Sequence, residues 1–153
     1  LPLLERKKPD LRQFSAEALG MIGKPALQPV VHRLDAGKRG YHVIALGHIG
    51  APGSVPVLLG LLDETTSGRA RRPLIKALGL IGGPAAVRRL TRILNADGGY
   101  IRVAAGKALA RIGTPAAVRA IHEARDTEHA KPKGKRMGHL VWALNLILDQ
   151  LER

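Results

Sequence analysis

Residues 77–82 read Ala-Leu-Gly-Leu-Ile-Gly, and near-copies of this hexapeptide recur along the chain. The copies are residues 18–23 (ALGMIG), 45–50 (ALGHIG) and 108–113 (ALARIG), with a degenerate one at 143–148 (ALNLIL). Successive copies start 27, 32, 31 and 35 residues apart. Self-similarity at such a period indicates stacked supersecondary units, each of which buries its apolar face only against its neighbours.

The third copy shows how one unit is built. Before and within it, apolar side chains recur at spacings of three and four residues, which predicts an amphipathic helix: Leu74, Ile75, Leu78 and Ile81. Gly-Gly-Pro at 82–84 then ends this helix, because Gly suits the left-handed residue after a helix and Pro suits the first turn of the next one. A second helix is predicted over residues 85–95, so the unit is a helical hairpin.

The small residues of the motif predict close packing between successive first helices. Each of the four clear copies begins with an alanine, which lets the neighbouring helix approach: Ala18, Ala45, Ala77 and Ala108. The third position is Gly20, Gly47 or Gly79 in the first three copies. Glycine inside a helix costs about 1 kcal/mol relative to alanine, so a close helix crossing is the expected compensation.

The pattern resembles HEAT-like repeats, in particular the short subtype named after the phycobilisome-lyase subunits. Pro-Ala-Ala-Val opens the second helices at Pro84 and Pro115, and an arginine precedes each clear motif by six residues. The resemblance covers about residues 9–151. Proteins that share such repeats include bilin lyases, deoxyhypusine hydroxylase, alkylpurine DNA glycosylases and bacterial scaffolds, so the fold alone does not select a function.

We therefore predict an all-α, right-handed α-solenoid of HEAT-like hairpins, forming one domain over residues 1–153. The predicted repeats are residues 9–36, 37–64, 68–96 and 99–126, followed by a degenerate C-terminal cap at 135–153. The polar segment 126–134 is predicted to be an irregular loop before the terminal helix, which is placed at roughly residues 136–153.

The composition points to an anionic partner. The chain of 153 residues has 25 Lys and Arg against 12 Asp and Glu, a net charge of +13, which favours encounter with anions. It contains no cysteine, which excludes disulfides and thiolate metal sites, and we expect a cytoplasmic protein. No apolar run approaches the length of a membrane span.

The arginines form two predicted groups. Arg12, Arg39, Arg71 and Arg102 each lie six residues before a motif alanine. The resemblance implies a structural role for them, in hydrogen bonds to carboxylates and carbonyls between repeats, and Asp35 is a candidate partner of Arg39. A ladder that tracks phosphates is the alternative.

The second group is predicted to bind a partner. Proteins of this kind line their concave face with the second helices, and four arginines converge there in the third and fourth repeats: Arg88, Arg89, Arg92 and Arg119. A guanidinium group binds both carboxylates and phosphates, so this face suits either anion. A solvated helix surface is the competing interpretation.

No catalytic constellation is visible. The sequence shows no Gly-rich phosphate loop, serine nucleophile motif or paired catalytic carboxylates. His122-Glu123 is the only His-Glu pair, whereas the hydroxylase family binds iron through several. Glycosylases need aromatic platforms for bases, and Tyr100 and Trp142 lie on first helices, away from the expected concave face.

We accordingly predict a non-catalytic scaffold or adaptor that recruits an acidic protein or peptide through its basic concave face. Sequence-independent binding to a nucleic-acid backbone is the alternative, followed by a bilin-lyase-type subunit or a glycosylase-like protein. We predict no enzyme activity and no catalytic, cofactor-binding or metal-binding residues. The oligomeric state is left open.

Overall fold

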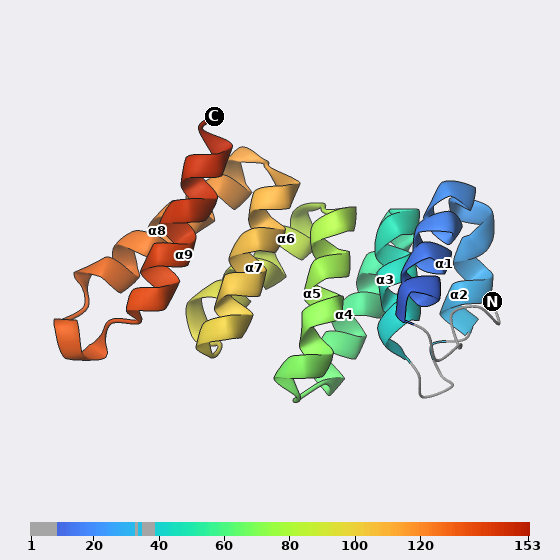
Figure 1. Cartoon of the computed structure of the whole chain (residues 1–153), viewed down its shortest axis with the longest axis horizontal. Helices are drawn as coiled ribbons and strands as arrows, with labels where there is room; N and C mark the ends of the chain where they lie inside the picture. Colours follow the sequence, from blue (N-terminus) through green and yellow to red (C-terminus); the bar gives the residue numbers. More distant parts are fainter. Residues whose placement is uncertain (1–8, 33, 35–38) are drawn as a thin grey trace. The chain divides into compact units, whose positions relative to one another are not determined.

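The structure, a computed structural model, describes residues 9–32, 34 and 39–153, with residues 9–12 and 39 described by their backbone alone (Figure 1). Regular structure within these ranges is entirely helical. The α-helices are α1 (Pro9–Ile22), α2 (Leu27–His32), α3 (Arg39–Ile49), α4 (Val55–Glu64), α5 (Gly68–Ile81), α6 (Pro84–Ala96), α7 (Gly99–Ile112), α8 (Pro115–Ala130) and α9 (Gly138–Leu151). Short 3₁₀ helices are η2 (Lys24–Ala26), η4 (Pro52–Ser54) and η5 (Lys133–Lys135).

The motif glycines end the first helices as predicted. Gly23, Gly50, Gly82 and Gly113 follow α1, α3, α5 and α7, and their φ angles lie between 66° and 74°. A side chain would be strained at such an angle, which explains why each motif ends in glycine. A proline follows two residues after each of these glycines and is the first or second residue of the second helix or of its leading 3₁₀ turn.

The chain divides into two compact units. The first ends at Gly82 and contains α1 to α5, and the second begins at Gly83 and contains α6 to α9. The boundary therefore falls inside the third predicted repeat, residues 68–96. That the two units act as a single domain stays a prediction.

In the first unit, the first helices α1, α3 and α5 pack in a row. A Cβ added at Gly20 would lie 2.6 Å from the Cβ of His48, and one added at Gly47 would lie 2.9 Å from the Cα of Ala77. No side chain fits at these crossings. The motif glycines therefore allow each first helix to touch the next, as predicted.

Ala18 departs from this pattern because α1 is the first described helix of the row. Ala45 and Ala77 are fully buried, whereas Ala18 is exposed. Its neighbours Phe14 and Met21 are also exposed, at 65% and 91%. Burial of the motif alanine requires a preceding first helix, and the described residues place none against α1.

In the second unit, α7 packs against α6, α8 and α9 around a core of aliphatic side chains. Leu90, Leu109, Ile121 and Leu144 are fully buried. Helix α8 continues to Ala130, one turn beyond the boundary expected at residue 126, and η5 follows. The prediction of an irregular loop over residues 126–134 is therefore wrong for residues 126–130, and the reason lies in the contacts of Glu128.

Candidate functional site

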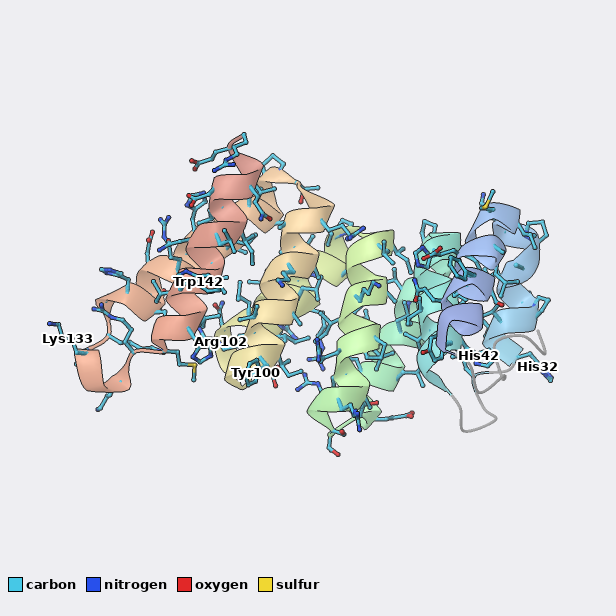
Figure 2. All side chains as sticks on the ribbon, viewed as in Figure 1. His32, His42, Tyr100, Arg102, Lys133 and Trp142 are labelled. Atoms are coloured by element: carbon cyan, nitrogen blue, oxygen red, sulfur yellow. The ribbon has the colours of Figure 1, made fainter. Side chains whose placement is uncertain are left out.

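Arg102 and Glu128 form a buried ion pair in the second unit. Arg102, on α7, is 4% exposed, and Glu128, near the end of α8, is fully buried. Arg102 is labelled in Figure 2. Its Nη1 donates to the Glu128 Oε2 over 2.8 Å, and its Nε donates to the carbonyl oxygen of Leu94 on α6. The predicted structural role of this arginine is confirmed, since it binds one carbonyl and one carboxylate from neighbouring helices.

Glu128 receives two further hydrogen bonds. The Lys131 Nζ donates to its Oε2 over 2.7 Å, and the backbone N–H of Met137 donates to its Oε1 over 2.8 Å. Burial opposes ionisation of this carboxyl, but the hydrogen bonds from Lys131, Met137 and Arg102 outweigh it and lower the pKa to about 2. Glu128 is therefore ionised at neutral pH despite its burial.

This ion pair fixes the start of α9. Met137 immediately precedes α9, so its hydrogen bond to Glu128 ties that helix to the end of α8. At the same end, the rings of Tyr100 on α7 and His139 on α9 lie 6.0 Å apart. The ion pair with Arg102 also accounts for the extra helical turn of α8, because Glu128 lies in that turn and its carboxylate contacts Arg102 from there.

The contacts of the other three arginines that precede a motif alanine by six residues are less fully described. Arg71 is half-buried on α5 and takes part in an interaction. The side chains of Arg12 and Arg39, and all of Asp35, lie outside the described residues. The structural role inferred for them therefore stays a prediction.

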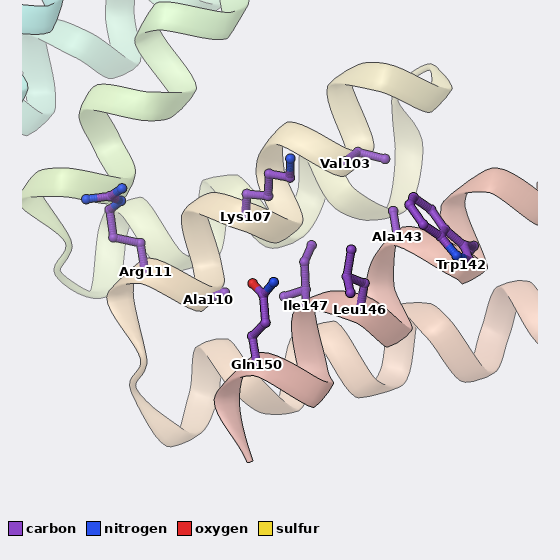
Figure 3. Close-up of a pocket in the computed structure, with 9 residues that line it drawn as sticks. All are labelled: Val103, Lys107, Ala110, Arg111, Trp142, Ala143, Leu146, Ile147 and Gln150. Carbon is purple, nitrogen blue, oxygen red and sulfur yellow. The ribbon is translucent and has the colours of Figure 1, made fainter. Parts of the chain in front are cut away.

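A groove of about 590 Å³ runs between α7 and α9 (Figure 3). Nine residues line it: Val103, Lys107, Ala110, Arg111, Trp142, Ala143, Leu146, Ile147 and Gln150. Its volume lies within the range of about 300–1,000 Å³ that is common for small-molecule sites.

The groove is apolar at one end and polar at the other. Figure 3 shows Val103 close to Trp142 at one end, with Arg111 and Gln150 toward the other and Lys107 between them. Trp142 is 68% exposed. The lining contains two cationic side chains and no acidic one.

Lys107 and Arg111 place two positive charges on the α7 side of the groove. They lie four residues apart on α7, and both are exposed. Like charges at this spacing destabilise a helix by a few tenths of a kcal/mol. An anion between them would reverse the sign of that contribution, which makes the pair a candidate anion site.

The motif positions that form helix crossings in the first unit line the groove here. In the first unit, Gly47 at the third motif position touches Ala77 and Leu80, the first and fourth positions of the next first helix. The third position on α7 is Ala110 instead of glycine, and the matching positions on α9 are Ala143 and Leu146. These three residues line the open groove rather than a helix crossing.

The close approach of α7 and α9 moves to Gly106, one turn before Ala110. A Cβ added at Gly106 would lie 2.9 Å from the Cδ2 of Leu144. The two helices thus remain in contact at Gly106 while their surfaces separate over the groove. The sequence did not predict this candidate site, because Trp142 lies on a first helix, away from the expected concave face. The replacement of the motif glycine by Ala110 was the available signal.

The predicted partner-binding arginines lie on the other helical layer of the second unit. Arg88 and Arg92 are exposed one turn apart on α6, and Arg119 is exposed on the neighbouring α8. Arg89 was expected on the same surface but is half-buried and takes part in an interaction. Its position beside the buried Leu90 explains the difference. The binding role of all four stays a prediction.

Across the part of the chain that the structure describes, no three His, Cys, Asp or Glu side chains gather into a group that could hold a metal ion. Among the same residues, no helix has the length and apolar character needed to span a membrane.

Family models match two segments of the chain. The model for HEAT repeats matches residues 35–105, and the model for the PBS lyase HEAT-like repeat matches residues 101–127. The chain is a HEAT-like repeat protein. Its repeats are of the phycobilisome-lyase type, and the predicted all-α class of HEAT-like helical hairpins is confirmed.

Two known proteins are similar to this HEAT-like chain. The phycocyanobilin lyase subunit beta of Thermosynechococcus vestitus is 32% identical over 84 residues, which is 53% of this chain and 39% of the relative. The match thus spans about two fifths of the relative's length. A chain in the structure of the complex of CpcE and CpcF of phycocyanin lyase from Nostoc sp. PCC7120 superposes with a TM-score of 0.75. That likeness, at 20% identity over 95% of this chain and 94% of the other, concerns the fold.

These similarities correct two predictions. The chain was expected to be a non-catalytic scaffold for an acidic protein and not an enzyme, yet the curated relative is a lyase subunit. The error has a physical origin. Compact constellations of metal ligands, nucleophiles and paired carboxylates are visible in a sequence, whereas a repeat protein distributes its side chains over helices that only the fold brings together.

Proposed function

We propose that this chain is a subunit of a lyase that acts on a bilin, an open-chain tetrapyrrole. The observation that carries the proposal is the 32% identity over 84 residues with a phycocyanobilin lyase subunit. The fold supports it, since the chain superposes along most of its length on a chain from a phycocyanin lyase complex.

The chemistry of the chain suits such a substrate. A bilin combines a conjugated, largely apolar ring system with two propionate carboxylates, so it needs an apolar surface beside cationic groups. The second unit offers this combination in Lys107, Arg111 and Trp142. The chain contains no cysteine, so it offers no thiol through which a bilin could be held covalently.

We further propose that the lyase works with protein partners and that one of them docks on the arginine surface, defined here as Arg88, Arg92 and Arg119. These exposed guanidinium groups suit carboxylates on an acidic protein. The net charge of +13 would accelerate that encounter at low ionic strength. Lyase chemistry would then take place where the bilin and the partner are both bound.

The test is a reconstitution. The chain would be incubated with phycocyanobilin and recombinant apo-phycocyanin, alone and with CpcE or CpcF from Nostoc as the second subunit. Covalent bilin on the acceptor would be followed on denaturing gels by its fluorescence. The proposal predicts faster attachment when the chain is present. It is contradicted if no combination changes the rate and the chain shows no saturable binding of phycocyanobilin.

A further inference from the structure

The groove between α7 and α9 has the dimensions of an extended ligand. Its two walls run from Val103 to Arg111 on α7 and from Trp142 to Gln150 on α9. Eight residues of α-helix rise about 12 Å, so each wall is about that long. Ala143 and Ile147 are 8% and 5% exposed, so they form an apolar floor between the walls.

The exposed side chains on the walls differ in chemistry. Trp142 and Leu146 are 68% and 45% exposed, which is unusual for large apolar side chains and marks a surface that a ligand can cover. Lys107 and Arg111 supply positive charge beside them. An indole face attracts flat conjugated rings, and both cations form charge-assisted hydrogen bonds with carboxylates.

We propose that this groove is the bilin-binding site of the chain, an inference that rests on the proposed function. The pyrrole rings lie against Trp142 and Leu146, and the propionate carboxylates pair with Lys107 and Arg111. The absence of acidic side chains from the lining favours a dianionic ligand over a neutral one. The bilin is bound noncovalently here.

The buried ion pair of Arg102 and Glu128 positions the two helices that form this groove. Arg102 lies on α7 five residues before Lys107, and its partner Glu128 accepts the hydrogen bond from Met137 that fixes the start of α9. Arg102 and Glu128 are therefore positioning residues for the groove, since they do not line it.

Trp142 makes the proposal directly measurable. It is the single tryptophan of the chain, so fluorescence excited selectively at tryptophan comes from one side chain of the groove. The chain would be titrated with phycocyanobilin, with correction for light absorbed by the bilin. We expect saturable quenching of Trp142 together with a change in the bilin absorption spectrum. The dimethyl ester of the same bilin lacks both carboxylates and should bind at least tenfold more weakly.

Two matched variants separate the groove from general attraction by charge. Lys107→Gln with Arg111→Gln removes two charges from the groove and should raise the Kd at least tenfold. Lys133→Gln with Lys135→Gln removes two charges from exposed positions of η5, outside both proposed binding surfaces, and should change the Kd less than twofold. All four positions are exposed, so both variants should fold, which circular dichroism would verify. Trp142→Phe, followed through bilin absorption, should weaken binding severalfold.

The results of these titrations test the groove as the bilin site separately from the proposed lyase function. Quenching of Trp142 with weaker binding only in the groove variant supports the proposal. If bilin absorption changes saturably without quenching of Trp142, the groove is not the binding site. The same holds if both double variants lose bilin affinity equally. In either case the lyase proposal stands. If neither signal saturates for the wild-type chain, the site is overturned, and the reconstitution then decides separately on lyase activity.

Discussion

The row of first helices in the first unit and the α7–α9 pair in the second use the same motif positions to opposite effect. In the first unit, glycine at the third position brings the next helix into van der Waals contact, as at Gly20 and Gly47. In the second unit, Ala110 occupies that position and lines a groove. The departure from the motif at this position marks the place where the surfaces of α7 and α9 separate.

The α7–α9 pair is also held in place by different interactions from those of the first unit. Contact between the first helices of the first unit depends on small residues, whereas α9 is anchored through the ion pair of Arg102 and Glu128 and the hydrogen bond to Met137. The groove therefore depends on a polar anchor at one end of the helices. Each prediction below changes one element of this comparison.

The largest effect should come from Glu128→Ala. It leaves the buried Arg102 guanidinium without its carboxylate, and removing one partner of a buried ion pair costs about 3–5 kcal/mol. Urea unfolding would measure the loss of stability. Glu123→Ala, at an exposed position of the same helix, should stay within about 0.5 kcal/mol of wild type. Equal effects at the two positions would refute the anchoring role.

Acid should weaken the same anchor. The pKa of Glu128 is lowered from 4.5 to about 2 in the folded chain, so its stabilising contribution is complete above about pH 4.5 and is lost as the pH falls toward 2. A shift of that size corresponds to about 3 kcal/mol. Unfolding would be measured from pH 6 to pH 2 for wild type and Glu128→Gln. The variant should show a smaller pH dependence in this window; parallel curves would refute the assignment.

Gly47→Leu should destabilise the first unit. The new side chain would meet the backbone of Ala77, and overpacking of this kind costs about 1–3 kcal/mol. Gly60→Ala is the matched control, since nothing lies within 4 Å of an added Cβ on this residue of α4. The control should gain up to about 1 kcal/mol from helix propensity. Thermal unfolding would compare the two; a stabilised Gly47 variant would contradict the close crossing.

Ala110→Gly should have the smallest effect. The residue lines an open groove, so the glycine gains no contact and costs about 1 kcal/mol in helix propensity. Bilin affinity, measured by quenching of Trp142, should change less than threefold. If the variant is instead more stable and no longer binds bilin, α9 has closed onto α7, and Ala110 alone keeps the groove open.

Much of the fold is encoded locally and was predictable. The spacing of Leu74, Ile75, Leu78 and Ile81 sets a helical face, and glycine followed by proline sets each turn, because both effects act within a few residues. The structural role of Arg102 was implied by the resemblance to HEAT-like repeats, in which an arginine stands at this distance from the motif. Glu128 escaped prediction because its partners, Arg102 and Met137, lie 26 and 9 residues away.

The candidate site was less accessible from the sequence. Lys107 and Trp142 lie 35 residues apart, and only the register of α7 against α9 brings them to one groove. The sequence directed attention to Arg88, Arg89, Arg92 and Arg119 because clustered charge is visible without a fold. An amphipathic groove whose walls come from two helices has no such local signature.

The most direct test of the account is a crystal structure of the chain bound to phycocyanobilin. The account predicts bilin density between α7 and α9, with its rings against Trp142 and its carboxylates within hydrogen-bonding distance of Lys107 and Arg111. Density on the arginine surface of α6 and α8, with the groove empty, would contradict it.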